Sequence, residues 1–259
     1  MRAPKKPKLA VWKFASCDGC QLTLLDCEDE LLDLVGAIDI AYFPEATHVH
    51  MPGPYDLSLV EGSITTPDDA RRIQLVRKQS KIVVAIGACA VSGGIQALRN
   101  TANIYDYAET VYPHPEWIET LSNSKPIHDY VKVDYELRGC PISKPQLLEF
   151  LTAVLSGKKP SIPNYSVCEE CKRSGRVCVV VAQGAACMGP ITQAGCGAIC
   201  PSFSRGCYGC FGPCNSPNTE SWSQLMTKHG VSKLEQLRLL QGINCAAEPF
   251  KAQSEALSR

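Results

Sequence analysis

Residues 8–20 read KLAVWKFASCDGC, and the architecture of the chain follows from this segment. Residues 8–16 have the apolar character of a buried β-strand, and residues 21–35 carry leucines at helical spacing. Cys17 and Cys20 therefore fall in the turn between a strand and a helix. A cysteine-bearing turn of this kind predicts the first strand-helix unit of an α/β protein.

The alternation of strands and helices continues along the first 157 residues. Pro67, followed by Asp68 and Asp69, suits the N-terminus of a helix. Such alternation predicts an α/β fold with a parallel, flavodoxin-like sheet and helices on both faces. The further strands are expected at residues 38–43, 56–61, 81–86 and 130–135, and the further helices at 67–80 and 143–156.

The character of the sequence changes after residue 157. A polar, proline-bearing link occupies residues 158–163. We therefore expect two domains, a flavodoxin-like domain over residues 1–158 and a small irregular domain over residues 159–259.

Within the second part, residues 168–214 sustain neither a helical nor a strand period. Bound groups, rather than an apolar core, are therefore expected to order them. Helical spacing returns over residues 220–240, as two helices broken near Gly230. The last residues, 246–259, look like a loose surface segment.

Charge and cysteine content narrow the class of protein. The 259 residues include 26 basic and 26 acidic ones, which gives no electrostatic reason to expect nucleic acid or an anionic membrane as partner. No apolar run approaches the ~20 residues of a membrane span, and the basic start lacks an export signal's apolar stretch. We expect a cytoplasmic protein, whose fifteen cysteines ligate metal rather than form disulfides.

Four cysteines follow predicted strands of the first domain. Cys17 and Cys20 follow the first strand, Cys89 follows the fourth, and Cys140 follows the last. Functional groups of parallel sheets collect at the carboxyl ends of the strands, so these thiolates are expected to surround one iron-sulfur cluster. The alternative is two core cysteines beside a thioredoxin-type redox pair. Glycine-rich phosphate-binding motifs are absent from the first turn.

Nine further cysteines lie between residues 168 and 214, and eight are enough for two four-iron clusters. Two C-x-x-C pairs, at 168–171 and 207–210, allow adjacent ligands to reach two corners of one cube. Zinc also suits such pairs, so the alternative function is a zinc-stabilised structural or interaction subunit without redox activity. One of these nine cysteines therefore remains without a ligand role, as do Cys27 and Cys245.

These motifs resemble the small subunits of nickel-iron hydrogenases over nearly the whole chain. The first half has CDGC (17–20), EGS (61–63), GACAVSGG (87–94) and GCP (139–141). The second half has VCEEC (167–171), CMGPITQAGCGAICP (187–201) and RGCYGC (205–210), which resemble the cytoplasmic, group 3 branch. That branch includes sulfhydrogenases and NAD(P)-linked and F420-non-reducing hydrogenases. Cys168 stands where periplasmic members have histidine, and Ile142 where many relatives have proline.

The resemblance implies three [4Fe-4S] clusters and assigns their ligands. The proximal cluster takes Cys17, Cys20, Cys89 and Cys140; the distal one takes Cys168, Cys171, Cys178 and Cys187; the medial one takes Cys196, Cys200, Cys207 and Cys210. Glu61, beside the proximal ligands, is a candidate for an ordering or proton-passing role, with a solvated or helix-capping acid as the alternative.

The resemblance also implies the function and the partners. The hydrogen-activating NiFe site lies on a large subunit, and this chain is expected to relay electrons between that site and a redox partner. Flavin- or NAD(P)-binding and ferredoxin-like iron-sulfur subunits are the expected further partners. A respiratory-complex subunit of the same ancestry resembles only the first domain, and it carries adjacent cysteines in place of CDGC.

Overall fold

The computed structural model describes residues 6–259, apart from the side chains of residues 31–35. The basic start of the sequence, on which the expectation about export partly rests, lies largely outside the described residues. No helix within residues 6–259 is both long and apolar enough to cross a bilayer.

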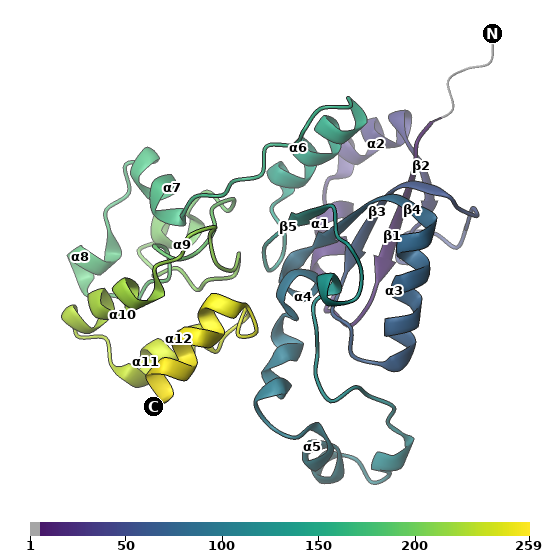
Figure 1. Cartoon of the computed structure of the whole chain (residues 1–259). Helices are drawn as coiled ribbons and strands as arrows, with labels where there is room; N and C mark the ends of the chain where they lie inside the picture. Colours follow the sequence, from purple (N-terminus) through teal and green to yellow (C-terminus); the bar gives the residue numbers. More distant parts are fainter. Residues whose placement is uncertain (1–5) are drawn as a thin grey trace.

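A five-stranded parallel sheet forms the centre of the first region (Figure 1). Its order is β2-β1-β3-β4-β5, a doubly wound order whose switch point lies between β1 and β3. In register, Leu59 of β3 lies between Val11 of β1 and Val84 of β4. The predicted α/β class is therefore confirmed. The strands are β1 (Lys8–Lys13), β2 (Asp39–Tyr42), β3 (Tyr55–Glu61), β4 (Ser80–Ile86) and β5 (Tyr135–Leu137).

Helices cover both faces of the sheet because neighbouring strand residues point in opposite directions. Leu59 packs in one apolar cluster with Phe150, whereas Val60 packs in another with Ile73. Helices α1 (Gly19–Leu25), α2 (Glu28–Ala37) and α6 (Lys144–Leu155) lie on the first face, and α3 (Pro67–Gln79) lies on the second. Helix α3 begins as predicted, with Pro67 in its first turn.

The single helix expected over residues 21–35 is wrong, since the chain forms α1 and α2 with a break between them. The amide of Cys27 donates to the Leu24 carbonyl at 3.3 Å, which closes the end of α1 tightly. Glu28 then has φ of 41°, outside the right-handed helical region. Leucine spacing alone did not reveal this local turn.

The strand expected over residues 130–135 is displaced, because pairing with β4 begins only at Tyr135. The carboxylate of Asp134 accepts the Val83 amide at 2.9 Å and pairs with Arg77 at 2.6 Å. The Asp134 side chain thus accepts the Val83 hydrogen bond that a carbonyl of a neighbouring strand would otherwise accept. The alternating pattern at residues 130–133 belongs to a turn that packs Val131 under the sheet.

A long excursion, which the sequence analysis did not resolve into elements, joins β4 to β5 (Figure 1). It begins with α4 directly at the end of β4, and so carries Cys89 beside the sheet edge. Its elements are α4 (Gly87–Ser92), η1 (Ile95–Thr101), α5 (Ile104–Val111), η2 (Pro115–Trp117) and η3 (Ile127–Asp129).

The second region consists of short helices around an apolar cluster. The expectation that residues 168–214 lack an apolar core is wrong, because Val179 and Met188 pack against Trp222 and Phe250 of the following helices. The two helices expected over residues 220–240 are confirmed. The region contains α7 (Val167–Arg173), α8 (Val179–Gln183), α9 (Ile199–Ser202), α10 (Thr219–Lys228), α11 (Lys233–Leu240) and α12 (Glu248–Ser258).

The loose surface segment expected at the end of the chain is also wrong, since residues 248–258 form α12. Phe250 is only 1% exposed, and Ser254 and Leu257 follow it at helical spacing on the packed side. One large apolar side chain, supported by partners from distant residues, is enough to dock this helix.

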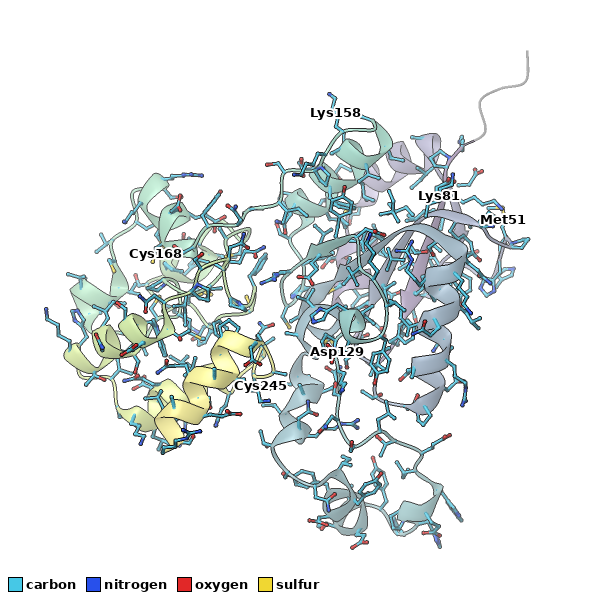
Figure 2. The ribbon with its side chains drawn as sticks, in the orientation of Figure 1. Met51, Lys81, Asp129, Lys158, Cys168 and Cys245 are labelled. Atoms are coloured by element: carbon cyan, nitrogen blue, oxygen red, sulfur yellow. The ribbon has the colours of Figure 1, made fainter. Side chains whose placement is uncertain are left out.

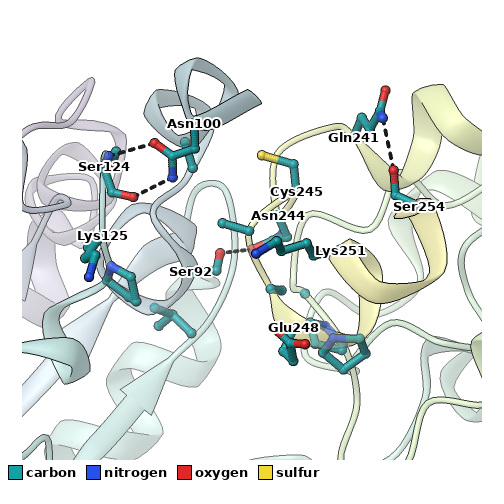
Figure 3. A pocket seen from close by; sticks show the side chains of 18 of the residues that line it. Ser92, Asn100, Ser124, Lys125, Gln241, Asn244, Cys245, Glu248, Lys251 and Ser254 are labelled. Atoms are coloured by element: carbon teal, nitrogen blue, oxygen red, sulfur yellow. Dashed lines mark hydrogen bonds between the residues drawn. The ribbon is translucent and has the colours of Figure 1, made fainter. Parts of the chain in front are cut away.

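The two regions meet along a cleft of about 990 Å³ (Figures 2 and 3). Asn244 crosses it, accepting from the Ser92 hydroxyl at 2.5 Å and donating to the carbonyls of Gly209 and Cys210. Arg138 also crosses it, donating to the Pro213 carbonyl at 2.6 Å. These buried contacts hold the end of β5 beside the cysteine-rich loops.

Candidate metal centres

Four cysteines of the first region, Cys17, Cys20, Cys89 and Cys140, lie at the carboxyl ends of β1, β4 and β5. Burial, the Glu61 carboxylate and the thiols of Cys89 and Cys140 together raise the pKa of Cys20. Burial raises the pKa of Cys89 to about 11, and Cys140 and Cys17 contribute to that shift. Each of the four thiols thus lies within electrostatic range of at least two others, at the edge where the sequence predicted them to meet.

Glycine is required where the backbone passes these sulfurs. Gly87 has φ of 81°, and a Cβ there would lie 2.4 Å from Sγ of Cys20. A Cβ on Gly94 would lie 2.5 Å from Sγ of Cys89. Any side chain at either position would displace a thiol, so the two glycines keep the space around this thiol set open.

Glu61, at the end of β3, is 1% exposed and is therefore not a solvated acid. Its Oε1 accepts the Cys20 amide at 3.0 Å, and its Oε2 accepts Nε2 of Gln21 at 2.8 Å. Burial raises the pKa of this carboxyl above its ordinary value. In the described contacts Glu61 holds the first turn of α1, and with it Cys20, against the sheet.

A second set of thiols gathers around α7 and α8. Burial and, to a smaller extent, the thiols of Cys187, Cys171 and Cys178 together raise the pKa of Cys168 to about 12. Sγ of Cys187 accepts backbone amides from Gly189 at 3.4 Å and from Cys207 at 3.2 Å. Amide donors aimed at sulfur are the contacts that stabilise thiolate ligands.

The predicted medial ligands, called the third set here, are Cys196, Cys200, Cys207 and Cys210; Cys187 of the second set adjoins them, since its Sγ accepts the Cys207 amide and its thiol contributes to the raised pKa of Cys207. Burial raises the pKa of Cys210 to about 11, and the shift includes contributions from Cys196, Cys200 and Cys140. Cys140 belongs to the first set, so the first and third sets are neighbours. The backbone is tightly packed here, because a Cβ on Gly206 would lie 1.7 Å from the Ala186 carbonyl oxygen.

Glu170 connects the second and third sets, and the sequence analysis did not single it out. It lies on α7 within the CEEC motif, and its carboxylate accepts the amides of Gly195 and Ala198. The sequence does show an acidic pair, Glu169 and Glu170, between two cysteines, and this pair could have pointed to Glu170. Only the fold, however, brings the loop that carries Cys196 to the second acid of the pair.

The donor set fits iron-sulfur clusters, because it offers buried soft thiols and backbone amides directed at sulfur. Burial disfavours isolated thiolates here, and bound iron would supply the compensating positive charge. Within residues 6–259, no three His, Cys, Asp or Glu side chains are placed to hold a single metal ion. A cube binds each thiolate to a different iron, so its four ligands stand farther apart than those of one zinc ion.

The family resemblance leaves three cysteines, Cys27, Cys214 and Cys245, without a ligand role. Cys27 is fully buried, and its thiol donates to the Thr23 carbonyl at 3.4 Å, which agrees with a core thiol. Cys214 is half-buried and its amide donates to the Ile191 carbonyl. Cys245 is half-buried on the cleft between the regions, as Figure 3 shows.

Comparison with known proteins extends the argument from geometry to ancestry. The family model of the NADH ubiquinone oxidoreductase 20 Kd subunit matches residues 17–154. Sulfhydrogenase 2 subunit delta of Pyrococcus furiosus is 37% identical over 207 residues, covering 80% of this chain and 86% of that protein.

Two solved structures are similar. A chain of an NAD+-reducing [NiFe]-hydrogenase, 30% identical, superposes with a TM-score of 0.58 over 61% of this chain and 96% of that chain. A chain of the [NiFeSe]-hydrogenase from Dm. baculatum, 19% identical, shares the fold with a TM-score of 0.56 over 84% of this chain and 98% of that chain. The second likeness extends beyond the sheet into the cysteine-rich region.

Sheet and thiols together define a redox subunit of the α/β class that uses sulfur ligands. Sequence identity to known hydrogenase subunits over most of the chain then narrows this class. The chain belongs to the small subunits of group 3 [NiFe] hydrogenases, and it is an iron-sulfur subunit. The resemblance stated from the motifs is confirmed.

Proposed function

We propose that this chain relays electrons between the NiFe site of a large subunit and a redox partner through three [4Fe-4S] clusters. The observation that supports this most is the succession of three neighbouring thiol sets. Cys140 and Cys210 connect the first set to the third, and Cys171 and Cys196 connect the second to the third. A succession of this kind is what stepwise electron transfer through a protein needs.

The proposed ligands follow the three sets, divided between a flavodoxin-like domain (1–158) and an iron-sulfur domain (159–259). When bound, such clusters supply one-electron carriers whose potentials depend on hydrogen bonds and solvent exposure. The proximal ligands are Cys17, Cys20, Cys89 and Cys140; the medial ones are Cys196, Cys200, Cys207 and Cys210; the distal ones are Cys168, Cys171, Cys178 and Cys187.

Exposure of the thiols suggests where electrons enter and leave. Cys17 and Cys140 are exposed in the isolated chain, which suits a face that a large subunit covers. Cys178 is exposed in the other region, next to the exposed Val177 and Val181. Between these ends Cys207 is buried and Cys196 is half-buried, so the middle of the proposed route is less exposed than its two ends.

The proposed reaction is the reversible conversion of H2 into two protons and two electrons, with the hydrogen chemistry on the large subunit. Flavin- or NAD(P)-binding and ferredoxin-like subunits are proposed to exchange electrons with the distal end. One similar structure is an NAD+-reducing [NiFe]-hydrogenase, and one relative is a sulfhydrogenase subunit. The cytoplasmic location stays a prediction.

Metal analysis of the complex, purified anaerobically with its partners, tests the proposal. We expect about twelve iron atoms and twelve sulfides per copy of this chain, four of each per cluster. Cys187→Ser should lower the iron count by about four, whereas the matched variant Cys27→Ser should leave it unchanged. A colourless complex that contains zinc and no iron would instead support the structural alternative.

A further inference from the structure

Glu170 reaches from the helix of one thiol set to the loop of another. It lies on α7 next to Cys171, yet its Oε1 accepts the Gly195 amide at 2.9 Å and its Oε2 accepts the Ala198 amide at 3.1 Å. Oε2 also lies 3.9 Å from Sγ of Cys196. One carboxylate therefore accepts an amide from each side of Cys196, at Gly195 and at Ala198.

The neighbouring Glu169 provides an internal contrast. Its carboxylate is exposed and pairs with Arg173 at 3.3 Å, one turn along the same helix. Exposed pairs of this kind interact weakly with their surroundings, because solvent and salt screen them. Glu170 is half-buried, and it contributes to the raised pKa of both Cys171 and Cys196. Of the two adjacent acids, only Glu170 is aimed at the sulfur ligands.

Two physical effects of Glu170 act in the same direction. A negative charge beside a cluster disfavours the addition of an electron. In addition, the Gly195 amide donates to the carboxylate and is not available to sulfur, whereas the Ala198 amide is shared between the carboxylate and Cys196; amide donors to sulfur raise a cluster's potential. Both effects lower the reduction potential at the site that contains Cys196.

We propose that Glu170 is a positioning residue that lowers the potential of the medial site relative to the distal one. The inference rests on the proposed function, since it needs clusters at both sites. With clusters bound at both sites, one electron would pass from the medial to the distal cluster, which would oxidise the first and reduce the second without bond formation or proton transfer. Glu170 makes this outward step more favourable, because its carboxylate contacts Cys196 more directly than Cys171.

Redox titration of the anaerobic complex, followed by electron paramagnetic resonance, tests the proposal. Glu170→Gln keeps the shape but removes the charge, and we expect the medial midpoint potential to rise. We expect the equilibrium constant for one-electron transfer from the medial to the distal cluster to change about tenfold, which corresponds to about 59 mV. Glu170→Asp, which keeps the charge, and Glu169→Gln, the matched control, should remain close to the wild type.

The outcomes separate this proposal from the proposed function. A wild-type complex without medial and distal signals would overturn both. Wild-type signals with an unmoved medial midpoint in Glu170→Gln would overturn this proposal alone. Equal shifts in Glu170→Gln and Glu170→Asp would overturn it too, because a charge effect distinguishes them. Loss of about four iron atoms in Glu170→Gln only would assign Glu170 to assembly and reject tuning.

Discussion

The two regions of this subunit hold their cysteines by different means. In the first region, long buried strands form the core, and the thiols occupy turns where strands end. In the second, α7, α8 and α9 have seven, five and four residues, too short to be stable alone. There Cys187 and Cys207 are themselves members of the apolar cluster. Cys20 also belongs to the apolar cluster of the first region, so the difference is one of degree: the cluster of the second region contains Cys187 and Cys207 and packs against Cys171 and Cys196 as well.

Metal removal should produce the largest difference in stability between the two regions. Binding free energy of a structural metal is largely folding free energy, about 10–16 kcal/mol in zinc peptides. We expect anaerobic chelation to reduce hydrogen-exchange protection of residues 167–214 by more than about a hundredfold, while β3 and β4 keep theirs. Mass spectrometry of peptic fragments gives both values. Equal loss in β3 would show that the regions do not differ.

Truncation of one core aromatic in each region sharpens the comparison. Trp222 is 2% exposed, and its indole donates to the Cys187 carbonyl at 2.8 Å. Trp222→Ala and Phe150→Ala should each lower the free energy of unfolding by about 3–5 kcal/mol in urea titrations. Only Trp222→Ala should also lower the iron content. Iron loss in Phe150→Ala would contradict the assignment of metal-dependent order to the second region.

The contact between the regions is expected to contribute less. Asn244→Ala removes the hydrogen bonds to the Ser92 hydroxyl and to the carbonyls of Gly209 and Cys210, at a cost of about 1–3 kcal/mol. The Ser92 hydroxyl keeps the Ala88 carbonyl and the Gly209 carbonyl keeps the Gly212 amide, so the loss falls mainly on the Cys210 carbonyl. We also expect differential scanning calorimetry to resolve two transitions once this contact is lost. Asn123→Ala, on the exposed rim of the same cleft, is the control. A single unshifted transition in Asn244→Ala would show that other contacts couple the regions.

The smallest effect should come from pH, at His128 near the cleft. The hydrogen bond to Glu136 raises the pKa of His128 above its ordinary value of 6.5, and the two side chains are 3.4 Å apart. The resulting stabilisation is complete below pH 6.5 and disappears as the pH rises through the folded-state pKa. His128 is 48% exposed, so His128→Gln should lose only a few tenths of a kcal/mol, at pH 5.5 and not at pH 8.5. An equal loss at both pH values would contradict an ionic contribution.

Features of the fold that depend on nearby residues could be predicted from the sequence. The apolar run of β4 and the Pro67 start of α3 are local signals, and both elements lie where they were expected. The start of β5 depends on Asp134 and its distant partner Val83, which no local pattern reveals. Likewise, α12 is ordered by packing of Phe250 into a cluster built from residues 167–257.

The thiol sets show the same division between local and distant information. Cys17, Cys89 and Cys140 were expected to meet because parallel strands share a carboxyl edge, and they lie within electrostatic range there. The partition of the later cysteines came from family resemblance, since short helices impose no comparable rule. Glu170 was missed because Gly195, its partner, is 25 residues away. The assignment of particular thiols to clusters stays a prediction.

Gly206 illustrates how tight backbone packing limits the drift of a protein sequence. No side chain fits at this position, because the Ala186 carbonyl already fills the space beside its Cα. Gly197 and Gly175, in contrast, have open surroundings, and only their backbone conformation resists replacement. A saturation library that covers the three positions should therefore return glycine alone at 206. Residues of the loops around this close contact can vary in evolution, whereas position 206 itself has to remain glycine.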